Sequence, residues 1–126
     1  MKAETPYLEA LRYMENAKSQ LKIAGKNSYN YLDDKYVKTA AGIAYSGILV
    51  ALDEYLKRKE GSKYEKPKSI EEYRTKISKK DKKLLSLLNS AYYILHILGY
   101  YHGDTTIKTI KLGFEEAFAI IEYIKD

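Results

Sequence analysis

The stretch AAGIAYSGILVAL (residues 40–52) decides the fold, because it is the longest nearly uncharged run in the chain. A bilayer-spanning helix needs about 20 apolar residues, so this shorter run predicts a buried core helix. Asp33 or Asp34 can cap that helix and Gly61 can end it, which places the helix near 34–59. Its apolar residues extend around much of the circumference, so we expect it to be central.

Boundary signals also mark the helix that precedes this core. Thr5 followed by Pro6 is an N-cap with proline at the first helical position, and Gly25 is a stop signal. Between them, apolar residues recur every three or four positions. The pattern predicts a helix near 6–24.

The second half of the chain contains one short and two long helical patterns. Ser69 and Glu72 form a capping box that predicts a short helix of about eight residues. Ser78 with Asp81 forms a second, weaker box at the start of a long helix that ends before Gly103. Asp104 or Thr105 can cap the last helix. The predicted ranges are 70–77, 79–101 and 105–124.

These elements predict the fold class. Alternating apolar patterns with hairpin turns are missing, so we expect no sheet. Four long helices with short connections favour an all-α antiparallel four-helix bundle, with one additional short helix in the middle connection. At 126 residues the chain forms a single helical-bundle domain, 1–126.

Two of the long helices, near 34–59 and 79–101, carry apolar residues on more than one side. A bundle covers one broad face of each helix, so the excess predicts a homodimer, with packing inside one chain as the alternative. Small residues allow close helix approach, and tyrosines suit an interface because the ring is apolar and the hydroxyl polar. The candidate interface residues are Gly42, Gly47, Tyr100 and Tyr101.

Composition limits the compartment and the chemistry. The chain has no cysteine, which excludes disulfides, thiolate metal sites and a cysteine nucleophile. No cationic stretch followed by an apolar segment opens the chain, so we expect a cytoplasmic protein without a membrane segment. Motifs for zinc, di-iron or nucleotide chemistry are missing, and we expect no metal and no cofactor.

Positive charge is concentrated in the middle of the chain. The formal net charge is +5, and residues 57–83 carry 12 Lys and Arg against 5 Asp and Glu. Such a cluster raises the local concentration of polyanions, although a solvated, solubilising surface loop is the simpler explanation. The candidate nucleic-acid-binding residues are Lys63, Lys66, Lys68, Arg74, Lys79, Lys80, Lys82 and Lys83.

The two histidines, His96 and His102, are the candidate catalytic residues. His96 stands inside an apolar run, which is typical of a core or interface histidine. His102 precedes Gly103 at a predicted helix end, where the helix dipole favours the imidazolium and solvent can reach a general acid. A histidine at a helix C-terminus is, however, an ordinary capping residue, and this is the simpler explanation of His102.

The first two helical segments, YLEALRYMENAKSQLKIAG and DDKYVKTAAGIAYSGILVALDEYLKRKEG, resemble the opening of HEPN domains. The resemblance lies in an A-x-x-x-L helix followed by an alanine-rich helix that ends at a glycine. The chain is most similar to small stand-alone proteins of uncharacterised families in gut-type Bacteroidetes. The resemblance implies a four-helix bundle that dimerises.

Many HEPN domains are ribonucleases whose motif is an arginine, four to six intervening residues and a histidine, and the resemblance places His102 at that histidine. Leu95, His96 and Ile97 stand where the arginine belongs, so the motif is incomplete. We therefore expect a non-enzymatic HEPN-like module that acts by homodimerisation and by binding a macromolecular partner, either protein or RNA. The alternative is a metal-independent ribonuclease that uses His102.

Overall fold

The computed structural model describes residues 4–126, and every regular element in that range is helical. The α-helices are α1 (Pro6–Ala24), α2 (Asp34–Glu60), α3 (Ile70–Ser78), α4 (Lys82–Ala91) and α5 (Ile107–Ile121). Three further helical segments are η1 (Gly61–Lys63), η2 (Tyr92–Tyr101) and η3 (Glu122–Ile124). The expectation of no sheet is confirmed for residues 4–126, where only two isolated bridges occur. No helix in this range is long and apolar enough to cross a membrane.

Local capping explains where α1 begins and ends. The Thr5 hydroxyl accepts a hydrogen bond from the Leu8 amide at 3.2 Å, which satisfies one of the free N–H groups of the first turn. Gly25 has φ +69°, a left-handed conformation that glycine adopts without steric cost. The predicted range 6–24 is confirmed.

The predicted ranges of the other helices need small corrections. The long helix begins at Lys82 rather than residue 79, because Asp81 is its cap and accepts from the Leu84 amide at 2.9 Å. Ser78 instead closes α3 and donates to the Thr75 carbonyl. The last helix begins at Ile107, later than the predicted residue 105.

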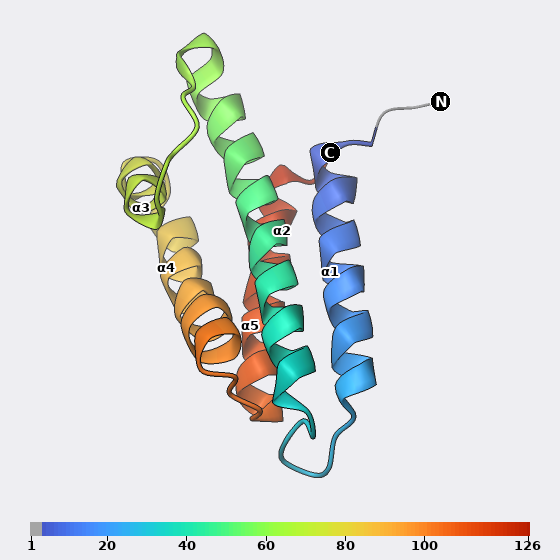
Figure 1. Cartoon of the computed structure of the whole chain (residues 1–126). Helices are drawn as coiled ribbons and strands as arrows, with labels where there is room; N and C mark the ends of the chain where they lie inside the picture. The colour runs from blue at the N-terminus through green and yellow to red at the C-terminus, as the bar shows by residue number, and fades with distance from the viewer. Residues whose placement is uncertain (1–3) are drawn as a thin grey trace.

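Helix α2 is the centre of the fold, as expected, and it packs against α1, η2 and α5 (Figure 1). Its neighbour α1 runs beside it in the opposite direction. Helix α3 contacts α4 and, to a smaller extent, α2, and it lies away from α1. The connection between α1 and α2 is joined to the segment that precedes α5, because the Tyr31 amide donates to the Thr105 carbonyl at 2.8 Å.

Much of the excess apolar surface predicted on α2 is covered within the chain. Ile43, Leu49 and Val50 are half-buried against the core. Large apolar side chains that remain exposed include Tyr93, Tyr100 and Tyr101, all in η2. The exposed apolar surface that a partner could cover is therefore smaller than the sequence suggested, and the part of it on η2 is aromatic.

Candidate functional site

The helix that starts at α4 changes its hydrogen-bond pattern at Tyr92 and continues as a π-helix to Tyr101. The His102 amide extends this pattern by donating to the Ile97 carbonyl, five residues earlier, at 3.0 Å. Extended π-helices are rare, and π-turns often occur at functional sites. Segment η2 is therefore a candidate for a functional role.

Three tyrosine side chains of η2 gather around His96. The His96 ring centroid lies 5.1 Å from that of Tyr92 and 5.7 Å from those of Tyr100 and Tyr101. Tyr45 of α2 completes the cluster, with its centroid 4.9 Å from the His96 ring. We call Tyr45, Tyr92, His96, Tyr100 and Tyr101 the tyrosine face.

Beside the tyrosine face lies a groove of about 500 Å³ without a charged side chain among its lining residues. Gly42 makes room for it, because a Cβ at this position would lie only 3.0 Å from Cδ1 of Tyr100. Burial, with a smaller effect of Tyr92, raises the pKa of Tyr45 to about 12, so its hydroxyl remains a donor. The uncharged groove is lined by Tyr13, Thr39, Gly42, Ile43, Tyr45, Ser46, His96 and Tyr100.

The four interface candidates divide into two groups. Gly42 and Tyr100 meet in the uncharged groove, and Tyr101 is 66% exposed. Gly47 is buried, and a Cβ there would lie 3.0 Å from Cβ of Tyr13 and 3.3 Å from the Ala10 carbonyl oxygen. Its small size serves the packing of α1 on α2, so Gly47 is not accessible to a second copy.

The two catalytic candidates do not share the groove. His96 is half-buried among the tyrosines, whereas His102 is exposed and follows the last turn of η2. His102 is not one of the lining residues of the uncharged groove. No group of three or more metal-ligating side chains occurs in the part of the chain that the structure describes.

Some of the basic candidates are engaged within the chain. Lys80 lies 3.3 Å from Glu60, and Lys66 lies 3.9 Å from Asp53. Arg74 pairs with Glu71 at 2.6 Å and also lies over the Tyr92 ring. The other candidates are exposed and make no ion pair in residues 4–126: Lys63, Lys68, Lys79, Lys82 and Lys83.

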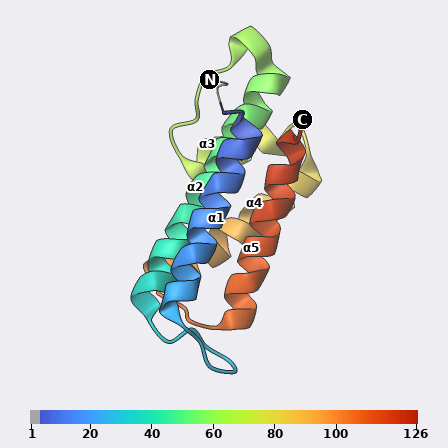
Figure 2. The ribbon, with the colours of Figure 1, turned by 90° about the vertical axis from the view of Figure 1, so that its right-hand side faces the viewer.

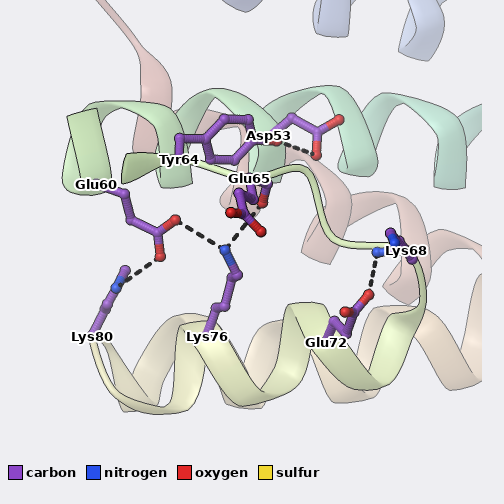
Figure 3. Close-up of polar contacts among 8 residues, drawn as sticks. All are labelled: Asp53, Glu60, Tyr64, Glu65, Lys68, Glu72, Lys76 and Lys80. Carbon is purple, nitrogen blue, oxygen red and sulfur yellow. Dashed lines mark hydrogen bonds and ion pairs between the residues drawn. The ribbon is translucent and has the colours of Figure 1, made fainter. Parts of the chain in front are cut away.

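Figure 3 shows the contacts that fasten α3 to α2. The Glu60 carboxylate accepts a hydrogen bond from Lys76 at 3.0 Å and also pairs with Lys80. Lys76 donates in addition to the Glu65 carbonyl at 3.0 Å, and Glu72 accepts from the Lys68 amide. Part of the basic segment therefore has a structural role in holding α3.

Sequence reasoning missed Asp53, which is the centre of a second polar contact. One carboxylate oxygen accepts hydrogen bonds from the hydroxyls of Tyr73 at 2.6 Å and Tyr64 at 3.3 Å. Burial, followed by the negative charge of Asp53, raises the pKa of Tyr64 to about 12. Burial, followed by the hydrogen bond to Asp53, also raises the pKa of Tyr73. Both tyrosines therefore stay protonated and act as donors.

The Glu60 contact makes stability depend on pH. The hydrogen bond from Lys76 is the main cause that lowers the pKa of Glu60 below its ordinary 4.5. The folded state therefore binds this proton less tightly than the unfolded chain does. The stabilisation is complete above the unfolded pKa and is lost as the pH falls through the lower folded pKa.

We expect Glu60→Gln to lower the free energy of unfolding by about 0.5 kcal/mol at neutral pH, as for ion pairs near a surface. The difference from the wild type should disappear in acid, below the folded pKa of Glu60. Urea unfolding of the variant and the wild type, at neutral pH and in acid, measures this difference in the free energy of unfolding. Glu65→Gln is the control, because only the backbone carbonyl of Glu65 contacts Lys76. An equal loss in both variants, or a Glu60→Gln difference that persists in acid, would contradict this account.

Comparison with known proteins assigns this chain to a family. Among curated proteins, none matches the chain. A solved structure of a protein of unknown function from Dyadobacter fermentans is similar, with 37% sequence identity and a TM-score of 0.83. The similarity covers 98% of this chain and 95% of that chain. Residues 5–126 match the family described as "Domain of unknown function (DUF5618)", and the chain therefore belongs to this family.

Proposed function

We propose that this protein is a non-enzymatic binding module that forms a homodimer through the tyrosine face and also binds a macromolecular partner. One observation carries the dimer: the uncharged groove lies beside exposed tyrosines in a chain of which 31% of the residues are charged. The cores of protein interfaces are depleted in charged residues and enriched in tyrosine.

The arrangement suits a two-fold interface, in which the same surface of each copy meets its equivalent. Tyr100 and Tyr101 are 49% and 66% exposed, so each presents ring area that a partner can cover. A second copy would bring its own Tyr101 toward the groove beside Gly42. Aromatic rings packed in this way contribute about 0.5–1.5 kcal/mol per pair beyond their area burial.

At the level of fold, we assign the chain to HEPN-like antiparallel four-helix bundles, with α3 as the additional short helix. This assignment rests on the resemblance of the first two helices and on the order of the remaining ones. Leu95, His96 and Ile97 occupy the positions of the nuclease arginine, and His96 is stacked between Tyr92 and Tyr100. These features favour a binding role over cleavage of RNA.

The dimer is tested by placing charge on the tyrosine face. We expect Tyr100→Glu/Tyr101→Glu to weaken self-association about a thousandfold, because the two carboxylates of each copy would lose their hydration in the interface core. Light scattering at about 100 μM should give twice the chain mass of 14.6 kDa for the wild type and the single mass for the variant.

The matched control is Tyr29→Glu, which changes a tyrosine that is 79% exposed and lies in the connection after α1. This variant should remain dimeric. A wild-type protein that is monomeric at this concentration, or a double variant that dimerises normally, would refute the proposed interface. Circular dichroism of all three proteins verifies that their helices are intact.

A further inference from the structure

A second groove, of about 570 Å³, lies between α1 and α5, which run side by side in Figure 2. Its apolar side chains come from both ends of the chain and are Leu21, Tyr31, Phe114 and Phe118. The volume falls in the range of about 300–1,000 Å³ that is typical of binding pockets. This groove shares no lining residue with the uncharged groove beside the tyrosine face.

Lysines line both sides of this apolar floor. Lys18 and Lys22 belong to α1, Lys26 follows α1, and Lys111 belongs to α5. Glu115 is the one acidic residue of the lining. We call this site the lysine groove.

Most of this positive charge has no partner inside the chain. Lys18 lies over the Phe118 ring, 4.8 Å from its centroid, and also 3.7 Å from Glu15. Within residues 4–126, no ion pair engages Lys22, Lys26 or Lys111. Unpaired cations around an apolar floor attract a ligand that is apolar on one side and negatively charged at its edges.

The distribution of the lysines selects among ligands of this kind. A second copy placed symmetrically on this groove would bring like charges together, which is unfavourable. A single-chain lipid carries one anionic head, which can engage only one end of the groove. The lysines, however, stand on both helices and are spaced along α1. An amphipathic helix with acidic flanks satisfies all of them and fills the floor with its apolar side chains.

We propose that the lysine groove binds an acidic amphipathic helix of a partner protein. The inference deepens the proposed binding role, on which it rests, by naming the chemistry of the partner. It is independent of the dimer, because the two grooves use different residues. A failed dimer test would therefore leave this proposal standing. A failed peptide-binding test would likewise leave the proposed dimer standing.

The test uses the full chain and a fluorescein-labelled synthetic peptide of about 18 residues. Its leucines follow the i, i+3, i+4, i+7 spacing of a helix, and glutamates flank this stripe. A second peptide has the same leucines with lysine flanks, and a third has the same glutamates with serines in place of leucines. We expect fluorescence anisotropy to show saturable binding of the first peptide only, weakening as salt is added.

Charge reversal in the chain locates the binding. Lys22→Glu/Lys111→Glu should weaken binding of the acidic peptide about tenfold or more. The control, Lys35→Glu/Lys108→Glu, makes the same change in net charge at exposed residues outside the groove and should change affinity less than about threefold.

Three outcomes would overturn the proposal. The first is that the acidic peptide fails to bind, or that the lysine-flanked peptide binds equally well. The second is that the two charge-reversed variants lose affinity equally, which would reflect net charge alone. The third is that vesicles of anionic phospholipid, or a uridine oligonucleotide, bind at the groove lysines while the peptide does not.

Discussion

Gly99→Ala is expected to lower the free energy of unfolding by about 2 kcal/mol, since a Cβ at this position has no space. It would lie 2.6 Å from Cβ of Ala41 and 3.3 Å from the Ile94 carbonyl oxygen. Neither atom can move without shifting a helix, so η2 and α2 must separate. Alanine in place of glycine also restricts the unfolded chain, but this raises the free energy of unfolding by only about 0.4–1 kcal/mol.

Gly42→Ala is the matched control, because Gly42 also lies where η2 meets α2. Its Cβ would approach only Cδ1 of Tyr100, at 3.0 Å, and this half-exposed ring can move. The gain from restricting the unfolded chain should offset the contact, leaving stability within about 0.5 kcal/mol of the wild type. Urea unfolding at one low protein concentration compares both variants without a contribution from dimerisation. Equal losses would show that η2 is not fixed against α2 at Gly99.

Asp53→Ala is expected to cost about 2 kcal/mol, because it removes the acceptor of the buried Tyr73 hydroxyl. Tyr73 is 5% exposed, and its hydroxyl donates to the carboxylate at 2.6 Å. Hydrogen bonds to charged groups contribute about 1.5–3 kcal/mol, and a buried donor left without a partner is costly. The higher helix propensity of alanine offsets about 0.5 kcal/mol of this loss.

Glu54→Ala removes the neighbouring carboxylate, which pairs with Arg58 near the surface at 2.8 Å. This control should lose less than about 0.5 kcal/mol. Combining Asp53→Ala with Tyr73→Phe closes a double-mutant cycle, and we expect a coupling energy of about 1 kcal/mol. Additive losses from the two substitutions, or equal losses from Asp53→Ala and Glu54→Ala, would show that the hydrogen bond does not hold α3.

Helix positions could be predicted from sequence because short-range signals determine them. Thr5 and Ser69 cap the helices that follow them, and Gly25 ends α1. The start of α4 was placed three residues early because Ser78 and Asp81 are both good caps. Only the structure shows that Ser78 is used by the last turn of α3.

The π-helix could not be predicted, because its sequence YYILHILGYY is apolar on all sides. Without a polar face, the pattern gives no period that separates one kind of helix from another. The close contact of Gly99 with Ala41 holds the segment in place, and this contact joins residues far apart in the chain. His96 and Tyr100 were singled out from sequence, but their stacking depends on this packing.

The Asp53 contact and the lysine groove could not be predicted either, for a related reason. A single acid such as Asp53 on a helix is ordinarily solvated, and its tyrosine partners follow 11 and 20 residues later. The lysine groove combines Lys18 and Lys22 with Phe114 and Phe118, which come from opposite ends of the chain. Neither combination forms a motif along the sequence.

The attachment of α3 has a consequence for local unfolding. Two of its residues, Tyr73 and Ile77, are buried, and its polar contacts reach Asp53 and Glu60 on α2 and Asn89 on α4. Little apolar surface is therefore exposed when residues 61–81 detach, while α1, α2 and α5 keep their mutual packing. We expect this segment to open at a lower free energy than the core formed by α1, α2 and α5, so its amides should exchange with solvent earlier and proteases should cut there before the core unfolds.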